Sequence, residues 1–186
     1  MSTAARLRDR LRNDEAGFTL IELVTVMGML LIVVMALSSA LIAAISSEDE
    51  MNRRFSSQVN ARIALDQLRR EIHCASAVTP AGASTSITII LGSRCPSAGA
   101  GTTVSWCSVG SGTRYALYRQ VGGTCSSTGK KAVDYITSAT LFSYTPQSVT
   151  SLAVLAVALP VNTNPASGRS DYRLEDDIVL RNSMRT

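Results

Sequence analysis

The chain has 186 residues, a formal net charge of +4 and a hydrophobic content of 46%. This length is enough for one domain, or for one modest domain with an appendage. Charges after residue 17 are nearly balanced and form no basic stripe with interleaved aromatic side chains, which argues against nucleic-acid binding. Hydrophobic residues are concentrated in residues 18–45. The remainder is polar, rich in Ser, Thr and Gly, and long enough to bury a core of moderate size.

The first seventeen residues form a short polar leader. It carries four arginines, against three acidic residues: Arg6, Arg8, Arg10 and Arg12, against Asp9, Asp14 and Glu15. Positive charge directly before an apolar span favours the cytoplasmic side of the membrane. We therefore expect residues from about 46 onward to lie outside the cytoplasm.

The apolar run from Leu23 to Ile45 is long enough to cross a bilayer. As a helix it would be about 35 Å long at 1.5 Å per residue. A cleaved secretory signal is the alternative, with cleavage after Ala40 or Ala44. Such signals have an apolar core of only about 7–15 residues, and this interpretation leaves the acidic Glu22 unexplained. We therefore favour a retained single-pass anchor with the N-terminus in and the C-terminus out.

A glycine, a phenylalanine and a carboxylate stand together where the apolar segment begins. Residues 17–24 read GFTLIELV. This motif, after a basic leader and before an apolar span, resembles the cleavage signal of type IV pilins and type II secretion pseudopilins. In that family a membrane aspartyl protease, the prepilin peptidase, cuts after the glycine and methylates the new terminal amine. The resemblance implies removal of residues 1–17, cleavage between Gly17 and Phe18, and N-methylation of Phe18.

Glu22 carries the single charge between residues 18 and 45. A charged side chain costs about 2.5–3.5 kcal/mol at the centre of a bilayer, so such residues are usually paired and functional. The resemblance implies that Glu22 is an assembly contact, which neutralises the terminal amine of a neighbouring subunit. Pairing with the amine of its own Phe18, one helical turn away, is the alternative.

From Ser46 onward the pattern becomes amphipathic. Apolar residues recur at helical spacing at Met51, Phe55, Val59, Ile63, Leu65, Leu68 and Ile72. We expect this stripe to lie on a sheet, and the helix to continue to residue 79, where Pro80 and Gly82 end it. The expected domains are a cytoplasmic leader (1–17), a transmembrane or filament-core helix (18–45), an amphipathic helix (46–79) and an extracytoplasmic β domain (80–186).

Short β-rich runs separated by turn residues fill the rest of the chain. We expect strands at Ser86–Leu91, Thr103–Val109, Arg114–Gln120, Tyr135–Tyr144, Ser151–Leu159 and Asp171–Asn182. Gly110-Ser111-Gly112 would form the turn of a hairpin between the second and third of these. Strands that follow one another favour an antiparallel sheet. The expected fold class is therefore α+β, pilin-like, with a long N-terminal helix packed on a small antiparallel sheet.

Four cysteines, Cys74, Cys95, Cys107 and Cys125, follow the span. Their spacing fits neither a zinc site nor a CxxC redox motif. An even count beyond a membrane segment indicates disulfides in an oxidising compartment, and reduced buried thiols are the alternative. If the strands from residue 86 to residue 120 form a meander, Cys107 lies at the end nearer the helix exit. Of the three possible connectivities, we expect Cys74–Cys107 and Cys95–Cys125.

Catalysis and metal binding have little support in the sequence. His73 is the only histidine, and it precedes Cys74 in a helix, where adjacent side chains point about 100° apart. The acidic run Glu175–Asp177, with Asp171 nearby, could bind calcium as acidic loops do in some pseudopilins, but a solvated strand edge is the simpler interpretation. We expect no enzymatic activity, no metal and no cofactor.

Part of the chain resembles particular members of the family. Residues 62–72 (RIALDQLRREI), 141–144 (LFSY) and 178–182 (IVLRN) are similar to J-type pseudopilins and W-type minor pilins. The resemblance implies a structural minor subunit at or near the tip of a type IV pilus or pseudopilus, where it primes assembly. A major pilin is one alternative. A membrane-anchored ectodomain that binds a ligand, as an adhesin or a DNA-uptake tip does, is another.

The family resemblance also implies partners and a location. The partners would be the prepilin peptidase/methyltransferase, other minor and major pilins, and the assembly platform of the inner membrane. Membrane lipid would surround the anchor before extraction, and nucleic acid would be a partner only of a DNA-uptake tip. The subunit would reside in the cytoplasmic membrane and then in an extracytoplasmic filament.

Overall fold

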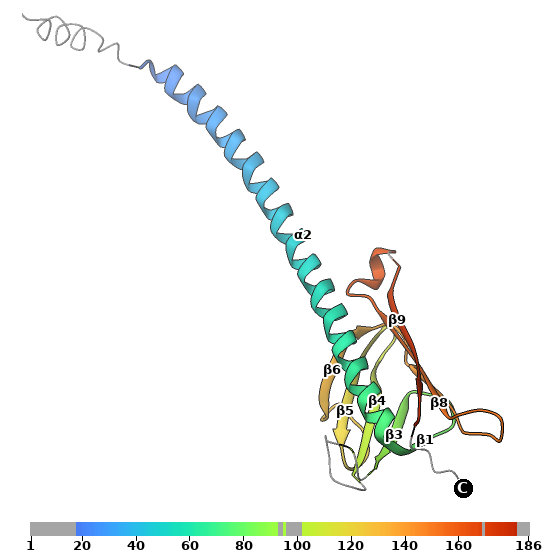
Figure 1. Cartoon of the computed structure of the whole chain (residues 1–186). Coiled ribbons are helices and arrows are strands. Elements are labelled where there is room, and N and C mark those ends of the chain that lie inside the picture. The colour runs from blue at the N-terminus through green and yellow to red at the C-terminus, as the bar shows by residue number, and fades with distance from the viewer. Residues whose placement is uncertain (1–17, 93–94, 96–101, 169, 182–186) are drawn as a thin grey trace, which may run out of the picture. The chain divides into compact units, whose positions relative to one another are not determined.

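The computed structural model describes residues 18–92, 95, 102–168 and 170–181 (Figure 1). The expected leader, Gly17 included, lies outside these residues. The described part contains one long α-helix, α2 (Leu20–Cys74), nine strands and a short 3-10 helix, η1 (Pro165–Ser167). The strands are β1 (Ala75–Thr79), β2 (Gly82–Ser84), β3 (Ser86–Leu91), β4 (Thr103–Ser111), β5 (Arg114–Val121), β6 (Lys130–Ile136), β7 (Phe142–Thr145), β8 (Val154–Val161) and β9 (Tyr172–Val179). The chain divides into two compact units, with the boundary between Asp49 and Glu50.

The first unit contains the part of α2 from Leu20 to Asp49. This segment is long and apolar enough to cross a membrane, since its thirty residues give about 45 Å against a hydrocarbon core of about 30 Å. Its hydroxyl groups bond within the helix. Ser38 Oγ donates to the Val34 carbonyl at 2.8 Å, and Ser39 and Ser46 donate to carbonyls three residues back. These bonds remove most of the cost of placing hydroxyl groups in lipid.

In the second unit, the last part of α2 packs on the sheet, which curls around it (Figure 1). The buried residues of α2 are Ser57, Ala61, Ala64, Leu65, Leu68, Glu71 and Ile72. They lie on one face at the helical period, and the small Ala61 and Ala64 let the helix approach the sheet closely. The expected packing of Leu65, Leu68 and Ile72 is confirmed.

The expectation that the whole apolar stripe lies on the sheet is wrong for its other four residues. Met51, Phe55, Val59 and Ile63 are exposed, with 74%, 66%, 36% and 58% of their surface accessible. Residues four apart advance by about 40° around a helix, so this row drifts onto the side opposite Ala61 and Leu68. The apolar residues of this part of α2 therefore lie on two faces of the helix, and only one face contacts the sheet.

The helix ends at Cys74, earlier than expected. Residues Ala75–Thr79 form β1 instead, antiparallel to β3, with Ala75 opposite Leu91 and Thr79 opposite Thr88. The β-branched Val78 and Thr79 favour a strand, and pairing with β3 satisfies backbone groups that a longer helix would have bonded internally. The chain therefore reverses direction five residues before Pro80, rather than at it.

All nine strands form one antiparallel sheet, with the order β1-β3-β4-β5-β6-β8-β7-β2 and with β9 also paired to β8. The expected strand Ser86–Leu91 is confirmed at both ends, and β3, β4 and β5 form the expected meander. The turn between β4 and β5 lies at Gly112 and Thr113, because Ser111 still pairs with Arg114. Gly112 has a φ of +61°, a conformation that glycine adopts at little cost.

The expected strand Tyr135–Tyr144 is in fact two strands, β6 and β7. Tyr135 has a φ of +63°, which takes the backbone out of the extended conformation. After Ile136 pairs with Val161, the chain leaves β6, and the Thr137 N–H donates to the Pro160 carbonyl at 3.0 Å. The strand that begins at Phe142 then pairs with the first half of β8. A change of pairing partner, rather than a turn residue, separates the two strands.

The core of the second unit lies between α2 and the inner face of the sheet. Its largest fully buried side chains include Trp106, Phe142, Leu68 and Ile72. Along β8, buried residues alternate with half-buried ones, so that Leu155, Val157, Leu159 and Val161 face inward. This alternation is typical of a sheet that has one face on the core.

Candidate functional site

The described chain begins with two residues outside the helix, Phe18 and Thr19, before α2 starts at Leu20. Phe18 is 76% exposed. The Thr19 carbonyl accepts a hydrogen bond from the Leu23 N–H at 3.1 Å, and the Thr19 Oγ1 accepts one from the Glu22 N–H at 3.3 Å. Thr19 is therefore the N-cap of α2, and Glu22 occupies the third helical position. A Thr and a Glu at this spacing form the sequence pattern of a capping box.

Glu22 lies in the first turn of α2 with its side chain exposed. Its carboxylate lies where the partial positive charge of the helix N-terminus favours an anion. No described side chain forms an ion pair with it. The structure thus presents one outward-facing carboxylate within an apolar surface, four residues after Phe18.

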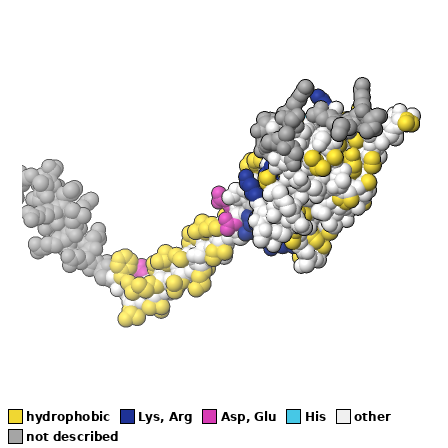
Figure 2. Space-filling view, turned by 90° about the horizontal axis from the view of Figure 1, so that it is seen from below, with side chains coloured by type: hydrophobic (Ala, Val, Ile, Leu, Met, Phe, Trp, Pro, Cys, Tyr) yellow, Lys and Arg dark blue, Asp and Glu magenta, His cyan; other side chains and the backbone are white. Residues whose placement is uncertain are grey.

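A second apolar surface lies farther along α2. The exposed residues Met51, Phe55, Val59 and Ile63, which we call the outer stripe, follow one another at four-residue spacing on the face opposite the sheet. Figure 2 shows apolar side chains covering the first part of α2, followed by a band of acidic and basic side chains. In the sequence, the outer stripe directly follows the acidic residues Glu48, Asp49 and Glu50.

A buried cluster around Glu71 holds α2 on the sheet. The Glu71 carboxylate, 1% exposed, accepts hydrogen bonds from Trp106 Nε1 at 2.8 Å and from Arg119 Nε at 2.8 Å. Arg119 Nη2 lies 2.7 Å from the same carboxylate, and Gln67 Nε2 donates to it at 3.3 Å. Sequence reasoning missed this cluster, although Glu71 lies on the same helical face as Leu68 and Ile72, where a charge needs a partner.

Two exposed contacts join α2 to β9. Arg69 donates to the Asp176 carboxylate at 2.7 Å, and the Arg62 guanidinium donates to the Tyr172 hydroxyl at 3.2 Å. The hydrogen bond to Asp176 raises the pKa of Arg69 above its ordinary value. Asp176 is thus engaged by a cation, and Glu175 pairs with Arg173. Among the described residues no group of His, Cys, Asp and Glu side chains is arranged to hold a metal ion.

The structure contradicts the expected disulfide pairing. The disulfides are Cys74–Cys95 and Cys107–Cys125, with Cα–Cα distances of 5.4 and 5.9 Å. The expectation placed Cys107 near the helix exit. Because β1 runs back along β3, the helix instead ends beside Leu91, where the Gly92 N–H donates to the Cys74 carbonyl at 3.0 Å.

The β-sheet register explains both pairings. Cys107 lies opposite Ser86, at the other end of β3 from Leu91, and is therefore remote from Cys74. On its other side Cys107 lies opposite Tyr118 of β5, whose carbonyl oxygen is 3.7 Å from Cys125 Sγ. The segment after β5 thus brings Cys125 back to Cys107 of β4. The segment after β3 brings Cys95 to Cys74 at the end of α2. One disulfide therefore joins the end of α2 to the segment after β3, and the other joins β4 to the segment after β5.

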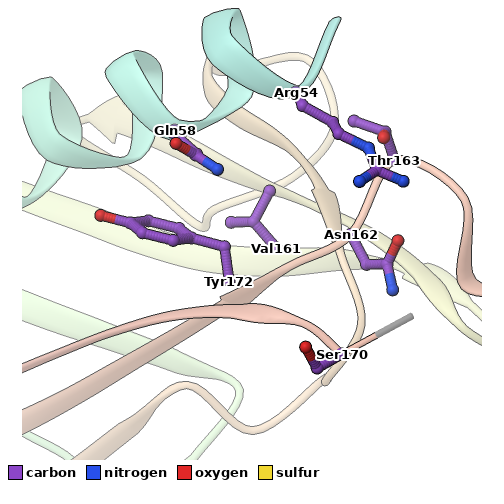
Figure 3. A pocket seen from close by; sticks show the side chains of 7 residues that line it. All are labelled: Arg54, Gln58, Val161, Asn162, Thr163, Ser170 and Tyr172. Carbon is purple, nitrogen blue, oxygen red and sulfur yellow. The ribbon is translucent and has the colours of Figure 1, made fainter. Parts of the chain in front are cut away.

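A small polar cavity lies between α2 and the strands β8 and β9 (Figure 3). Its volume is about 60 Å³, room for about two water molecules. It is lined by Arg54, Gln58, Val161, Asn162, Thr163, Ser170 and Tyr172. Thr163 Oγ1 is buried and has no hydrogen-bond partner among the residues that the structure describes. The size of this cavity suits water better than an organic ligand.

Beside this cavity, Asp171 joins β6, β8 and β9. It accepts hydrogen bonds from the Thr137 hydroxyl and from Asn162 Nδ2, the second at 3.0 Å. These bonds hold the pKa of Asp171 below its ordinary value. The carboxylate thus links the segments that follow β6 and β8 to the start of β9, and it is part of the scaffold.

The fold is an α+β arrangement, in which one long apolar N-terminal helix packs on a curled antiparallel sheet, and it is consistent with a pilin-like fold. Comparisons of the chain with models of protein families, with curated proteins and with solved structures found no match.

Proposed function

We propose that the chain is a structural subunit of a type IV pilus or of a type II secretion pseudopilus. The prepilin peptidase removes residues 1–17, α2 holds the mature subunit in the cytoplasmic membrane, and the assembly platform then moves it into a filament. The observation that carries the proposal is a helix exposed and apolar from Leu20 to Ile45, with one outward-facing carboxylate, Glu22, in its first turn.

The apolar surface of the helix is suited to the two environments that the subunit would occupy in turn, the membrane and the filament core. Exposed apolar patches of this extent do not remain in water. Lipid covers the segment before extraction, and helices of neighbouring subunits cover it afterwards. Small residues along the segment, among them Ala36, Ala40 and Ala44, allow helices to approach closely in both environments.

The outer stripe is evidence for contacts between subunits, because lipid would not cover it. Glu48, Asp49 and Glu50 precede it, and charged side chains such as these are costly in hydrocarbon. The stripe faces away from its own sheet, so neither lipid nor the core of the second unit covers Phe55 and Ile63. A neighbouring subunit would bury them.

Glu22 would fix the position of each subunit relative to its neighbour in the filament. A carboxylate among apolar side chains is best stabilised by a cation, and cleavage after Gly17 creates an α-amine at Phe18 that is charged near neutral pH. A neighbouring subunit in the filament supplies such an amine. The two disulfides support a destination outside the cytoplasm, because disulfides persist in oxidising compartments.

The minor-subunit assignment rests on the resemblance of residues 62–72 to J-type pseudopilins and W-type minor pilins. Within this segment, Leu65, Leu68 and Glu71 face the sheet and its buried cluster. We propose a position at or near the filament tip, where the subunit primes assembly with other minor subunits and with the major subunit.

The test of this function separates membrane insertion from incorporation. The wild-type chain and the Glu22→Gln and Glu22→Val variants are produced in a cell that has a prepilin peptidase and a filament system. Membrane and sheared-filament fractions are then compared. Both variants should enter the membrane normally and be lost from the filament at least tenfold. Wild-type levels of Glu22→Val in the filament would refute the assembly role of Glu22.

A further inference from the structure

We propose that a groove beside the outer stripe binds the acidic residues Glu48 and Asp49 of a second copy of this chain. The groove lies between α2 and β6 and has a volume of about 230 Å³. The inference rests on the proposed function, because it names the neighbour that covers the outer stripe in a filament.

The groove combines apolar and basic side chains. Ile63 and Ala64 of α2 and Ala132 of β6 line it, together with Lys130 and Lys131. Both lysines are exposed, and they are the only two lysines of the chain. Ile63 also belongs to the outer stripe, so the two surfaces are continuous. Such a surface fits a partner that presents carboxylates next to apolar side chains.

The sheet leaves the groove open. β6 pairs with β5 from Lys130 to Ile136, but it pairs with β8 at Ile136 alone. No other described strand pairs with the beginning of β6. Lysines on an open strand edge oppose the addition of a further strand. The partner is therefore recognised by its side chains and not by β-sheet pairing.

The groove carries a net positive charge. Lys130 forms no ion pair with a described side chain, and Lys131 lies 2.8 Å from the Asp134 carboxylate. Because that pair is exposed to solvent, it is weak and can be exchanged for another carboxylate. Arg119 also lines the groove, but the buried Glu71 balances its charge.

The chain itself presents the matching segment. Glu48 and Asp49 are exposed, and neither forms an ion pair with another described residue. Met51, the first residue of the outer stripe, follows two positions later. A second copy thus brings two carboxylates and an apolar stripe to a surface that holds two lysines and Ile63. Opposite charges arranged in this way select the partner and fix its register.

The contact requires a shift between the two copies. Ile63 is thirteen residues after Glu50, which is about 20 Å along the helix axis. A neighbour with a parallel helix, displaced outward by about this length, has its acidic segment level with the groove. Because the groove and the acidic segment are different surfaces, the contact is head-to-tail and repeats along a filament.

Charge reversal in the full-length chain tests the contact. The pair Lys130→Glu, Lys131→Glu and the pair Glu48→Lys, Asp49→Lys should each lower the amount in sheared filaments about tenfold, since like charges then face each other. Both pairs combined in one chain should restore incorporation to within about twofold of the wild type. Arg173→Glu changes an exposed cation of β9 outside the groove. This control should leave incorporation unchanged.

A carbodiimide, which joins an amine directly to a carboxylate, gives a second measurement on wild-type filaments. The chain has only two lysines, so the products are few. The covalent dimer should contain Lys130 or Lys131 linked to Glu48 or Asp49, as identified by mass spectrometry. This measurement needs no variant, so it stands even where a charge reversal impairs folding or export.

The outcomes separate this inference from the proposed function. Wild-type dimers without this linkage, or a combined variant that forms its disulfides but is not rescued, overturn the inference alone. A linkage to a different subunit does the same. Loss of the Lys130→Glu, Lys131→Glu chain from the membrane fraction would mean that the groove faces anionic lipid, which also overturns it. Failure of the wild type to be processed and incorporated removes the proposed function, and the inference with it.

Discussion

The indole Nε1 of Trp106 donates a 2.8 Å hydrogen bond to the carboxylate of Glu71, and both side chains are fully buried. Trp106 is in the middle of β4, and Glu71 is in the last turn of α2. Arg119 of β5 supplies the opposing charge. This contact fixes how α2 lies on the sheet, and thus which of its faces remains free for other molecules.

Removing the Glu71 carboxylate should destabilise the second unit strongly. Glu71→Ala leaves the Arg119 charge and the Trp106 N–H buried without their partner, which costs about 3–5 kcal/mol in such clusters. Denaturant unfolding of the full chain in detergent, followed by tryptophan fluorescence, measures this loss. Arg70→Ala, one residue away and exposed, is the matched control and should change stability by less than about 0.5 kcal/mol. A loss below 1 kcal/mol for Glu71→Ala would mean that the cluster does not hold the helix.

The two apolar faces of α2 should respond oppositely to substitution. Phe55→Ser and Ile63→Ser alter exposed side chains of the outer stripe, so the unfolding free energy should change little while incorporation into filaments falls. Leu68→Ala opens a cavity in the core and should cost about 2–5 kcal/mol. Unfolding and filament fractionation on the same variants give both measurements. Full incorporation of the Phe55→Ser, Ile63→Ser double variant would show that the outer stripe is not a subunit contact.

The disulfide connectivity is directly measurable. Non-reducing proteolysis and mass spectrometry should find Cys74 linked to Cys95 and Cys107 linked to Cys125. Loss of either disulfide, by a Cys95→Ser or a Cys125→Ser change, should cost about 3 kcal/mol, because each closes a loop of roughly twenty residues. A Cys74–Cys107 peptide in the oxidised wild type would contradict the register of β1 against β3.

Acid should weaken the second unit partly through Asp171. Because the folded-state pKa of Asp171 is lowered, its contribution to stability is present above the unfolded-state value of 3.8 and is lost as the pH falls through the folded-state pKa. Asp171→Asn should therefore flatten the stability curve below about pH 4. Thr137→Val, which removes one donor, should do so in part, and Asp177→Asn, at an exposed carboxylate of β9, is the control. A curve for Asp171→Asn as steep as that of the wild type would exclude this role.

Local patterns predicted the long helix and most of the strands. The apolar segment before Ile45 and the alternation in Ser86–Leu91 each determine a structure on their own, and both are confirmed. The strand β1 could not be predicted, because Ala75–Thr79 continues a helical pattern and becomes a strand only by pairing with β3. The Cys74–Cys95 disulfide depends on that same pairing, so the connectivity was predicted wrongly.

The sequence also could not predict which side chains in the second half of α2 contact the sheet. Met51 and Leu68 look alike in an apolar stripe, and only the position of the sheet distinguishes the exposed one from the buried one. Glu71 reads as a surface residue until Trp106 and Arg119 are brought to it from two strands. The cap at Thr19 differs, because its pattern with Glu22 is local and is visible in the sequence without any partner from the sheet.

The measurement that tests the central claim most directly is mass spectrometry of the N-terminus of the mature protein. The chain is produced in cells that have an active prepilin peptidase and, as a control, in cells with an inactive one. The proposed function predicts a chain that begins at Phe18 with a methylated amine in the first case, and an intact leader in the second. An intact leader, or a cut elsewhere than between Gly17 and Phe18, in cells with the active peptidase would contradict it.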